Sequence, residues 1–201
     1  MNEFPAHPTV PTAPGAPHCC LIGLRGAGKT TIGQLLAQRL GIEFFDLDDL
    51  ALRRLGHTSV TAVFSLGEPI WRAAEAAAAK AFFQAPLAPA VLALGGGAPL
   101  VPSIAALLKE RRDAARVIML DCGPATAEAR LHAGPGDRTS ITGLGVLEEL
   151  QVLALARRPR YLELADAVVD VNAGTPGEIA DRVASAFRQA ARSSSSQPSP
   201  R

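Results

Sequence analysis

The sequence predicts an α/β protein in three layers, with helices on both faces of a parallel sheet of five strands. Short apolar runs alternate along the chain with longer segments of helical periodicity, which is typical of repeated β–α units. A glycine-rich stretch at 23–30 directly follows the first apolar run and leads into the first helical segment. The chain has 201 residues, 48% of them hydrophobic, which is enough for one domain with a sizeable core.

The stretch 23–30 reads Gly-Leu-Arg-Gly-Ala-Gly-Lys-Thr and fits G-x-x-x-x-G-K-[ST], the phosphate-binding loop of nucleotide triphosphatases and kinases. Its glycines allow backbone N–H groups to approach an anion without the bulk of a Cβ atom. Lys29 adds positive charge, and the Thr30 hydroxyl is a suitable ligand for Mg²⁺. A glycine-rich turn beside a lysine is the alternative. The strand-like run at 18–22 and the helical spacing of 31–40 favour the nucleotide site.

The other elements follow in the order that a parallel sheet requires. Four further strands are expected, at 43–46, 91–94, 116–121 and 167–171. Helices are expected at 31–40, 47–55, 58–66, 69–85, about 102–110, 124–132, 145–164 and 177–190. Pro69 suits the first turn of the long helix at 69–85, and Pro159 is expected to interrupt the helix at 145–164. The phosphate loop belongs after the first strand.

The two ends of the chain differ in composition from the domain expected at 18–190. Residues 1–17 carry proline at every third position, which favours an extended, disordered arm. A ligand for a proline-binding partner is the alternative for this arm. Residues 191–201 are expected to be a disordered, serine-rich tail.

Composition argues against several classes of protein. A net charge of +1 and aromatic residues at 4% disfavour a nucleic-acid platform. Cys19, Cys20 and Cys122 lack the spacing of a zinc site and are interpreted as buried apolar residues in a reducing compartment. No leader pattern and no run long enough to span a bilayer are visible. We therefore expect a cytoplasmic protein without a membrane partner, and a monomer.

Two carboxylates end the second expected strand, in the stretch Asp46-Leu47-Asp48-Asp49. Ligands of parallel sheets lie beyond the carboxyl ends of the strands, so these groups are expected near the phosphate loop. A kinase needs one carboxylate for the Mg²⁺ shell and one to orient or deprotonate the attacking hydroxyl. Helix N-capping by Asp46 or Asp48 is the alternative, and it is compatible with function. Asp49 is interpreted as part of a solvated face.

Three later stretches are candidates for binding. Gly95-Gly96-Gly97 follows a buried strand and would let a substrate lie against bare backbone, or form a flexible turn. The loop at 133–143 is rich in glycine and could close over a nucleotide, with Arg138 stabilising the transferring phosphoryl group. The arginines of 157–161 either form a solvated face or bind a carboxylate or phosphate.

Together these motifs resemble those of shikimate kinase, a small phosphoryl transferase of aromatic amino-acid biosynthesis with the nucleoside monophosphate kinase fold. The resemblance covers about 19–190. It rests on the ordered set 23–33, 44–48, 67–75, 94–98 and Arg157-x-Pro159-x-Tyr161 with Ala165-Asp166. It implies a three-layer P-loop kinase fold with a mobile lid. It also implies that ATP, with Mg²⁺, phosphorylates the 3-hydroxyl group of shikimate.

The resemblance also implies a role for each matching residue. The ATP phosphates would be held by Gly26, Ala27, Gly28, Lys29, Thr30 and Thr31. The metal would be held by Thr30 and, through water, by Asp46. Shikimate would be bound by Asp48, Arg72, Arg157 and the backbone of Gly96. Arg138 matches the lid arginine over ATP, and the expected catalytic residues are Lys29, Asp48 and Arg138.

The match departs from the family pattern in three places, one of them an unusually alanine-rich helix at 72–83, and two other functions compete with it. Thr139 stands where the family usually has a lid proline, and Trp71 replaces the usual phenylalanine before Arg72. Shikimate-kinase-like domains also occur in regulators that bind an aromatic acyl-CoA, but no helix-turn-helix segment precedes this domain. A kinase for another small hydroxy acid, such as gluconate, is the second alternative.

Overall fold

The computed structural model describes residues 16–60, 63, 67–85, 88–133 and 145–194. Five strands form one sheet: β1 (His18–Ile22), β2 (Glu43–Asp46), β3 (Ala90–Ala93), β4 (Ala115–Asp121) and β5 (Ala167–Asp170). Every pairing is parallel, and the order across the sheet is β2-β3-β1-β4-β5. The phosphate loop follows the central strand β1. The predicted three-layer α/β/α fold with a five-stranded parallel sheet is confirmed.

The helices lie close to the ranges expected from the sequence. They are α1 (Lys29–Leu40), α2 (Leu47–Leu55), α4 (Glu68–Gln84), α5 (Pro102–Glu110), α6 (Pro124–Ala133), α7 (Val146–Leu164) and α8 (Pro176–Ser194), with a short 3₁₀ helix at Ala98–Leu100. The helix expected at 58–66 and the lid loop at 133–143 lie largely outside the described residues. Within the described ranges, no helix is both long and apolar enough to cross a bilayer. The cytoplasmic location and the monomer stay predictions.

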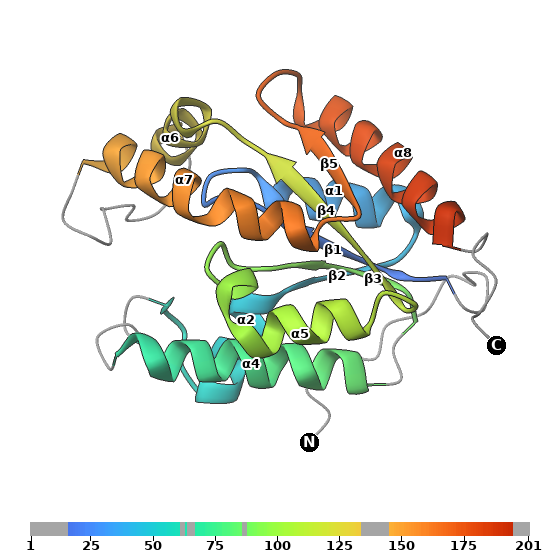
Figure 1. The fold of residues 1–201 in the computed structure, drawn as a ribbon, viewed down its shortest axis with the longest axis horizontal. Coiled ribbons are helices and arrows are strands. Elements are labelled where there is room, and N and C mark those ends of the chain that lie inside the picture. The colour runs from blue at the N-terminus through green and yellow to red at the C-terminus, as the bar shows by residue number, and fades with distance from the viewer. Residues whose placement is uncertain (1–15, 61–62, 64–66, 86–87, 134–144, 195–201) are drawn as a thin grey trace.

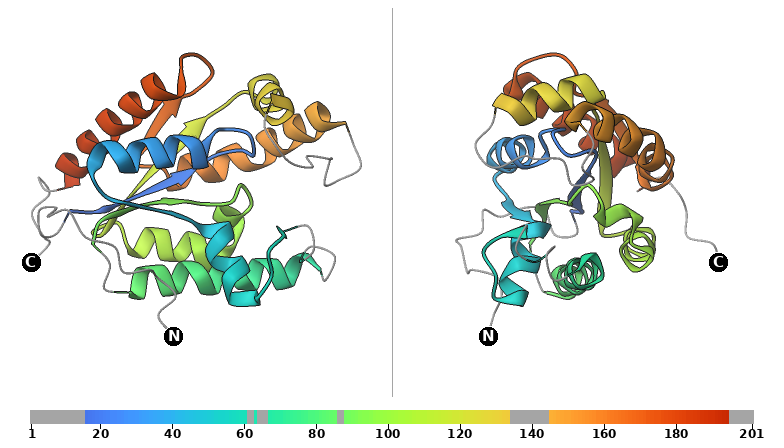
Figure 2. Two further views of the ribbon diagram at one scale, coloured as in Figure 1. Left: turned by 180° about the vertical axis from the view of Figure 1, so that it is seen from behind. Right: turned by 90° about the vertical axis from the view of Figure 1, so that its left-hand side faces the viewer.

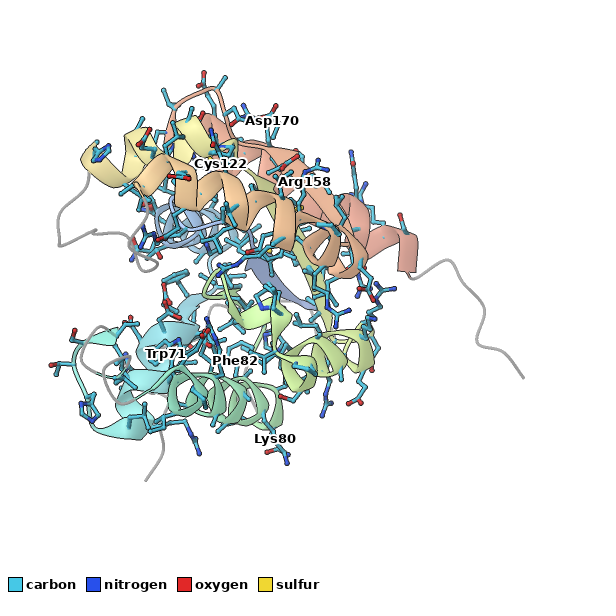
Figure 3. All side chains as sticks on the ribbon, turned by 60° about the vertical axis from the view of Figure 1, so that its left-hand side comes forward. Trp71, Lys80, Phe82, Cys122, Arg158 and Asp170 are labelled. Carbon is cyan, nitrogen blue, oxygen red and sulfur yellow. The ribbon has the colours of Figure 1, made fainter. Side chains whose placement is uncertain are left out.

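The sheet separates two hydrophobic cores. On one face α2, α4 and α5 pack against the sheet, and on the other face α1 and α8 do (Figure 1; Figure 2). Strand β1 contributes side chains to both cores, because successive side chains point to opposite faces of the sheet. Cys20 belongs to the first core, on the side of α2, α4 and α5, and Cys19 to the second core, on the side of α1 and α8. Both cysteines and Cys122 are buried and free, as predicted. The first core also holds Trp71, which points inward from α4 (Figure 3).

Two expectations need correction. Pro159 does not interrupt α7, which continues through it to Leu164. A proline here deprives the Leu155 carbonyl of its helical donor, but Leu155 is 81% exposed, so water can replace that donor. Helix α8 extends to Ser194, so 191–194 are helical rather than part of the expected tail. Helical spacing continues past 190, with Ala190 packed against the second core.

Candidate active site

The phosphate loop closes against the backbone of neighbouring elements. Gly26 has φ +82°, and a Cβ atom there would lie 2.6 Å from the carbonyl oxygen of Ala127 in α6. A Cβ atom at Gly23, whose φ is +147°, would lie 2.6 Å from the carbonyl oxygen of Leu120 in β4. Glycine is therefore required for packing as well as for access to an anion.

The start of α1 leaves donors free for a ligand. The first amide of this helix with a backbone acceptor is that of Ile32, which donates to Gly28 at 2.8 Å. Among the described residues, the amides of Lys29, Thr30 and Thr31 donate to no backbone acceptor. They lie at the positive end of the helix dipole, so the arrangement fits a phosphate group.

Lys29 lies against the loop itself. Its Nζ donates to the carbonyl oxygens of Gly23 at 3.0 Å and Leu24 at 2.9 Å. Burial lowers the pKa of Lys29 to about 8, although the carboxylates of Asp48 and Asp46 oppose this shift. A bound polyphosphate would add negative charge to that which the carbonyl dipoles and those two carboxylates already place near this ammonium group.

Thr30 and Asp46 meet between α1 and β2. Thr30 Oγ1 donates to Asp46 Oδ2 at 2.9 Å, while Asp46 Oδ1 accepts from the Asp48 amide at 3.0 Å. Asp46 is thus the N-cap of α2, which was one alternative expected from the sequence, and it also contacts Thr30 of the phosphate loop. A hydroxyl and a carboxylate side by side are the oxygen ligands that Mg²⁺ takes, with water completing its shell. The residues therefore fit the expected metal.

Asp48 is directed towards the glycine turn after β3. A Cβ atom at Gly95 would lie 2.5 Å from Asp48 Oδ1 and 2.9 Å from Glu75 Oε1, so the two carboxylates converge there. Asp48 Oδ1 is buried without a hydrogen-bond partner among the described residues. Burial, followed by the nearby charges of Asp46 and Glu75, raises the pKa of Asp48 to about 7. Such a carboxylate can accept a proton near neutral pH.

Arg72 projects from α4 to the same turn. Its Nη1 lies 2.7 Å from Glu75 Oε2 and its Nη2 lies 2.7 Å from Glu68 Oε1. Burial alone would lower the pKa of Arg72, but the two carboxylates outweigh burial and raise it. A Cβ atom at Gly97 would lie only 2.4 Å from both terminal nitrogens of Arg72. The guanidinium group is therefore held against bare backbone.

The arginines of 157–160 are separated by the turns of α7. Arg158 pairs with Asp121 at 2.9 Å, and Arg160 pairs with Glu163 at 2.5 Å on the outer surface. Arg157 instead faces inward: its Nη1 lies 3.4 Å from the position of a Cβ atom at Gly96. Arg158 and Arg160 thus match the solvated-face alternative, while Arg157 joins the candidate site, where binding of a carboxylate or phosphate stays a prediction.

Three further residues at the site were not assigned a role from the sequence. Glu75 is fully buried and braces Arg72. The Tyr161 hydroxyl donates to the Gly96 carbonyl at 2.5 Å. Arg130 donates to the carbonyl oxygen of Ala27 in the phosphate loop at 3.3 Å and to that of Val171 at 2.5 Å. The spacing of Arg72 and Glu75, one helical turn apart, was a usable signal for the first of these. Arg138 lies outside the described residues.

Comparisons with known proteins find similar sequences and similar structures. The family model for shikimate kinase matches residues 25–188. A shikimate kinase of Saccharopolyspora erythraea is 34% identical over 168 residues, covering 84% of this chain and 92% of the relative. The structure of shikimate kinase from Acinetobacter baumannii in complex with shikimate has a TM-score of 0.73 at 28% identity, covering 90% of this chain and 96% of that one.

A gluconokinase from Sinorhizobium meliloti has the same fold but is more distant. Its TM-score is 0.52 at 18% identity, covering 90% of this chain and 97% of that one. This likeness concerns the fold alone.

Proposed function

This chain belongs to the shikimate kinase family, and from that premise we propose that it transfers the γ-phosphoryl group of ATP to the 3-hydroxyl group of shikimate. The observation that carries the proposal is the convergence of three side chains on one glycine turn. Asp48, Arg72 and Arg157 come from α2, α4 and α7 and approach Gly95, Gly97 and Gly96 respectively. A Cβ atom at Gly96 would lie 3.3 Å from the amide nitrogen of Arg25, so the turn borders the phosphate loop.

The two arginines supply recognition of an acid. Arg72 and Arg157 approach successive glycines of one turn from two different helices. Planar guanidinium groups make paired, charge-assisted hydrogen bonds to a carboxylate. Among the described residues, the amides of Gly96 and Gly97 donate to no backbone acceptor, so they are open to the same ligand. A small carboxylic acid held here would have its ring hydroxyl groups near Asp48.

The phosphate loop positions the other substrate. The free amides at the start of α1 and the Lys29 ammonium group bind the ATP phosphates and stabilise the charge that develops during transfer. Thr30 and Asp46 would hold Mg²⁺, Asp46 through water. When bound, this ion neutralises charge on the phosphate oxygens. Arg138 completes the proposal as the lid arginine.

Asp48 serves as the group that orients and deprotonates the attacking hydroxyl. Its pKa of about 7 leaves it largely ionised at slightly alkaline pH, where it can accept the proton. Burial and the neighbouring carboxylates keep this pKa far above the usual value for aspartate.

One experiment tests the function directly. Release of ADP is followed in a coupled assay with MgATP alone, with shikimate and with gluconate, and the phosphorylated product is identified by NMR. We expect ADP release that depends on shikimate and a phosphate group on its 3-hydroxyl. Preference for gluconate would contradict the substrate, and no release with either acid, together with binding of an aromatic acyl-CoA, would favour the sensor alternative.

Variants of the two arginines extend this test. Arg72→Lys and Arg157→Lys should each raise the Michaelis constant for shikimate at least about tenfold, because lysine cannot reproduce a paired contact. The constant for MgATP should stay within about threefold, since neither side chain belongs to the phosphate loop. Unchanged constants for shikimate would show that the second ligand is misidentified.

A further inference from the structure

Tyr161 lies where α7 meets the glycine turn of the acid site. Its side chain is buried, with 1% exposure, in the first core. Its hydroxyl donates to the carbonyl oxygen of Gly96 at 2.5 Å, a contact between residues 65 positions apart. Burial raises the pKa of this hydroxyl, while the charge and hydrogen bonding of Arg157 and the charge of Arg72 lower it. The phenol therefore lies beside both arginines of the proposed clamp.

The turn that Tyr161 contacts has little intrinsic conformational preference. Three glycines in succession place no side chain against their surroundings, so their peptide groups can rotate at small cost. The described peptide bonds are all trans, and in a trans peptide the carbonyl of Gly96 points opposite to the N–H of Gly97. Holding the Gly96 oxygen towards Tyr161 of α7 therefore directs the Gly97 amide away from the phenol.

The same hydroxyl connects the turn to Arg157. Tyr161 follows Arg157 by one turn of α7, so both side chains emerge on one face of the helix. Helix α7 also contacts the 3₁₀ helix that begins directly after the glycine turn. The carbonyl of Gly96 would repel a carboxylate if it turned into the acid site, and its bond to the phenol prevents this rotation.

We propose that Tyr161 is a positioning residue of the acid site: by holding the Gly96 carbonyl against α7, its hydroxyl aligns the backbone of the glycine turn and the Arg157 guanidinium group for one carboxylate ligand. This inference rests on the proposed function, because the ligand is the carboxylate of shikimate. It assigns Tyr161 no contact with substrate and no part in phosphoryl transfer. We therefore expect loss of the hydroxyl to affect acid binding far more than nucleotide binding, although the turn borders the phosphate loop.

The test compares Tyr161→Phe with the wild-type enzyme. Phenylalanine keeps the buried ring and removes only the hydroxyl, so the carbonyl of Gly96 loses its donor. We expect the Michaelis constant for shikimate, and its dissociation constant by calorimetry without nucleotide, to rise about five- to tenfold. The turnover number and the constant for MgATP should stay within about twofold of wild type.

Ile104→Val provides the matched control for stability. Ile104 is buried in the same core on α5, and loss of one methylene there lowers the melting temperature by an amount comparable to loss of a hydrogen bond. Its kinetic constants should equal those of wild type. A purely structural role for Tyr161 would make the two variants alike, with a lower melting temperature and unchanged acid binding.

A double-mutant cycle with Arg157→Lys tests the connection itself. If the hydroxyl acts on the same carboxylate contact, the double variant should lose less affinity for shikimate than the product of the two single losses. The inference would be overturned if the Michaelis and dissociation constants of Tyr161→Phe for shikimate stayed within about twofold of wild type. It would also be overturned if the Tyr161→Phe chain did not fold. A wild-type enzyme that neither binds nor phosphorylates shikimate would instead overturn the proposed function.

Discussion

Gly97→Ala is the substitution that separates the stability of the fold from the geometry of the acid site. Gly97 has φ −89° and ψ −21°, a right-handed conformation that alanine adopts freely. The new Cβ atom would lie 2.4 Å from both terminal nitrogens of Arg72 and 2.5 Å from its Cζ. Ordinary contact begins at 3.4 Å, so the guanidinium group must withdraw by about 1 Å.

The expected loss of affinity for shikimate follows from the hydrogen bond that the displaced Arg72 can no longer make. A shift of this size removes or misaligns a charge-assisted hydrogen bond to the carboxylate, worth about 1.5–3 kcal/mol. The affinity for shikimate should therefore fall about ten- to 150-fold. Stability should change little, because the colliding group is the flexible end of a side chain. Replacing glycine by alanine in an allowed conformation also stabilises the folded state by about 0.4–1 kcal/mol, because it lowers the conformational entropy of the unfolded chain.

The assay measures three quantities on the same preparation: the melting temperature and the Michaelis constants for shikimate and for MgATP. Gly177→Ala is the matched control, because its Cβ atom would lie 3.3 Å from Nη2 of another arginine, Arg39, in the contact between α1 and α8. It should leave both constants unchanged. If the Michaelis constant of Gly97→Ala for shikimate stays within about threefold of wild type, Arg72 does not bind the acid from this position.

Further predictions concern Lys29, Asp48 and His18. Lys29→Ala should lower the turnover number about a hundred- to a thousandfold, because it removes the ammonium group of the phosphate loop; turnover within about threefold of wild type would refute the nucleotide site. Asp48→Asn should abolish transfer while calorimetry still finds MgATP binding. Because the folded-state pKa of Asp48 is raised to about 7, the folded state binds more protons than the unfolded state between about pH 4 and 7, so ionised Asp48 destabilises the fold. The melting temperature of Asp48→Asn minus that of wild type should accordingly increase as pH rises through this window. A difference that does not change with pH would contradict the raised pKa. Burial lowers the pKa of His18, whose Nδ1 accepts from the Ala90 amide at 3.2 Å, so the unfolded state binds more protons and wild-type stability should fall as pH drops below about 6.5. His18→Asn, which keeps an acceptor and cannot titrate, should show a shallower loss between pH 7 and 5 at unchanged kinetic constants, and an equal slope would exclude His18 as the cause.

Local sequence accounts for most of the elements and for the phosphate loop. The bounds of β1, β2, α2 and α5 coincide with the expected ranges, because each begins or ends at a change in apolar pattern or at a glycine or proline. Where the local signal is ambiguous, packing decides. Pro159 lacks a donor but sits in a helix whose opposite face buries Tyr161 and Leu164, and that burial holds α7 together through the proline.

The candidate site divides in the same way. The motif at 23–30 by itself determines that backbone amides, Lys29 and Thr30 gather at one helix start, because those residues are neighbours in the chain. The family resemblance singled out Arg157 among Arg157, Arg158 and Arg160, but the physical reason that it faces the site is tertiary, because it depends on the rotation of α7 against the sheet. The same holds for the burial of Glu75 beside Asp48 and for the contact of Tyr161 with Gly96, which join residues from separate elements. These two contacts depend on packing between separate elements, which the spacing of residues along the chain does not specify.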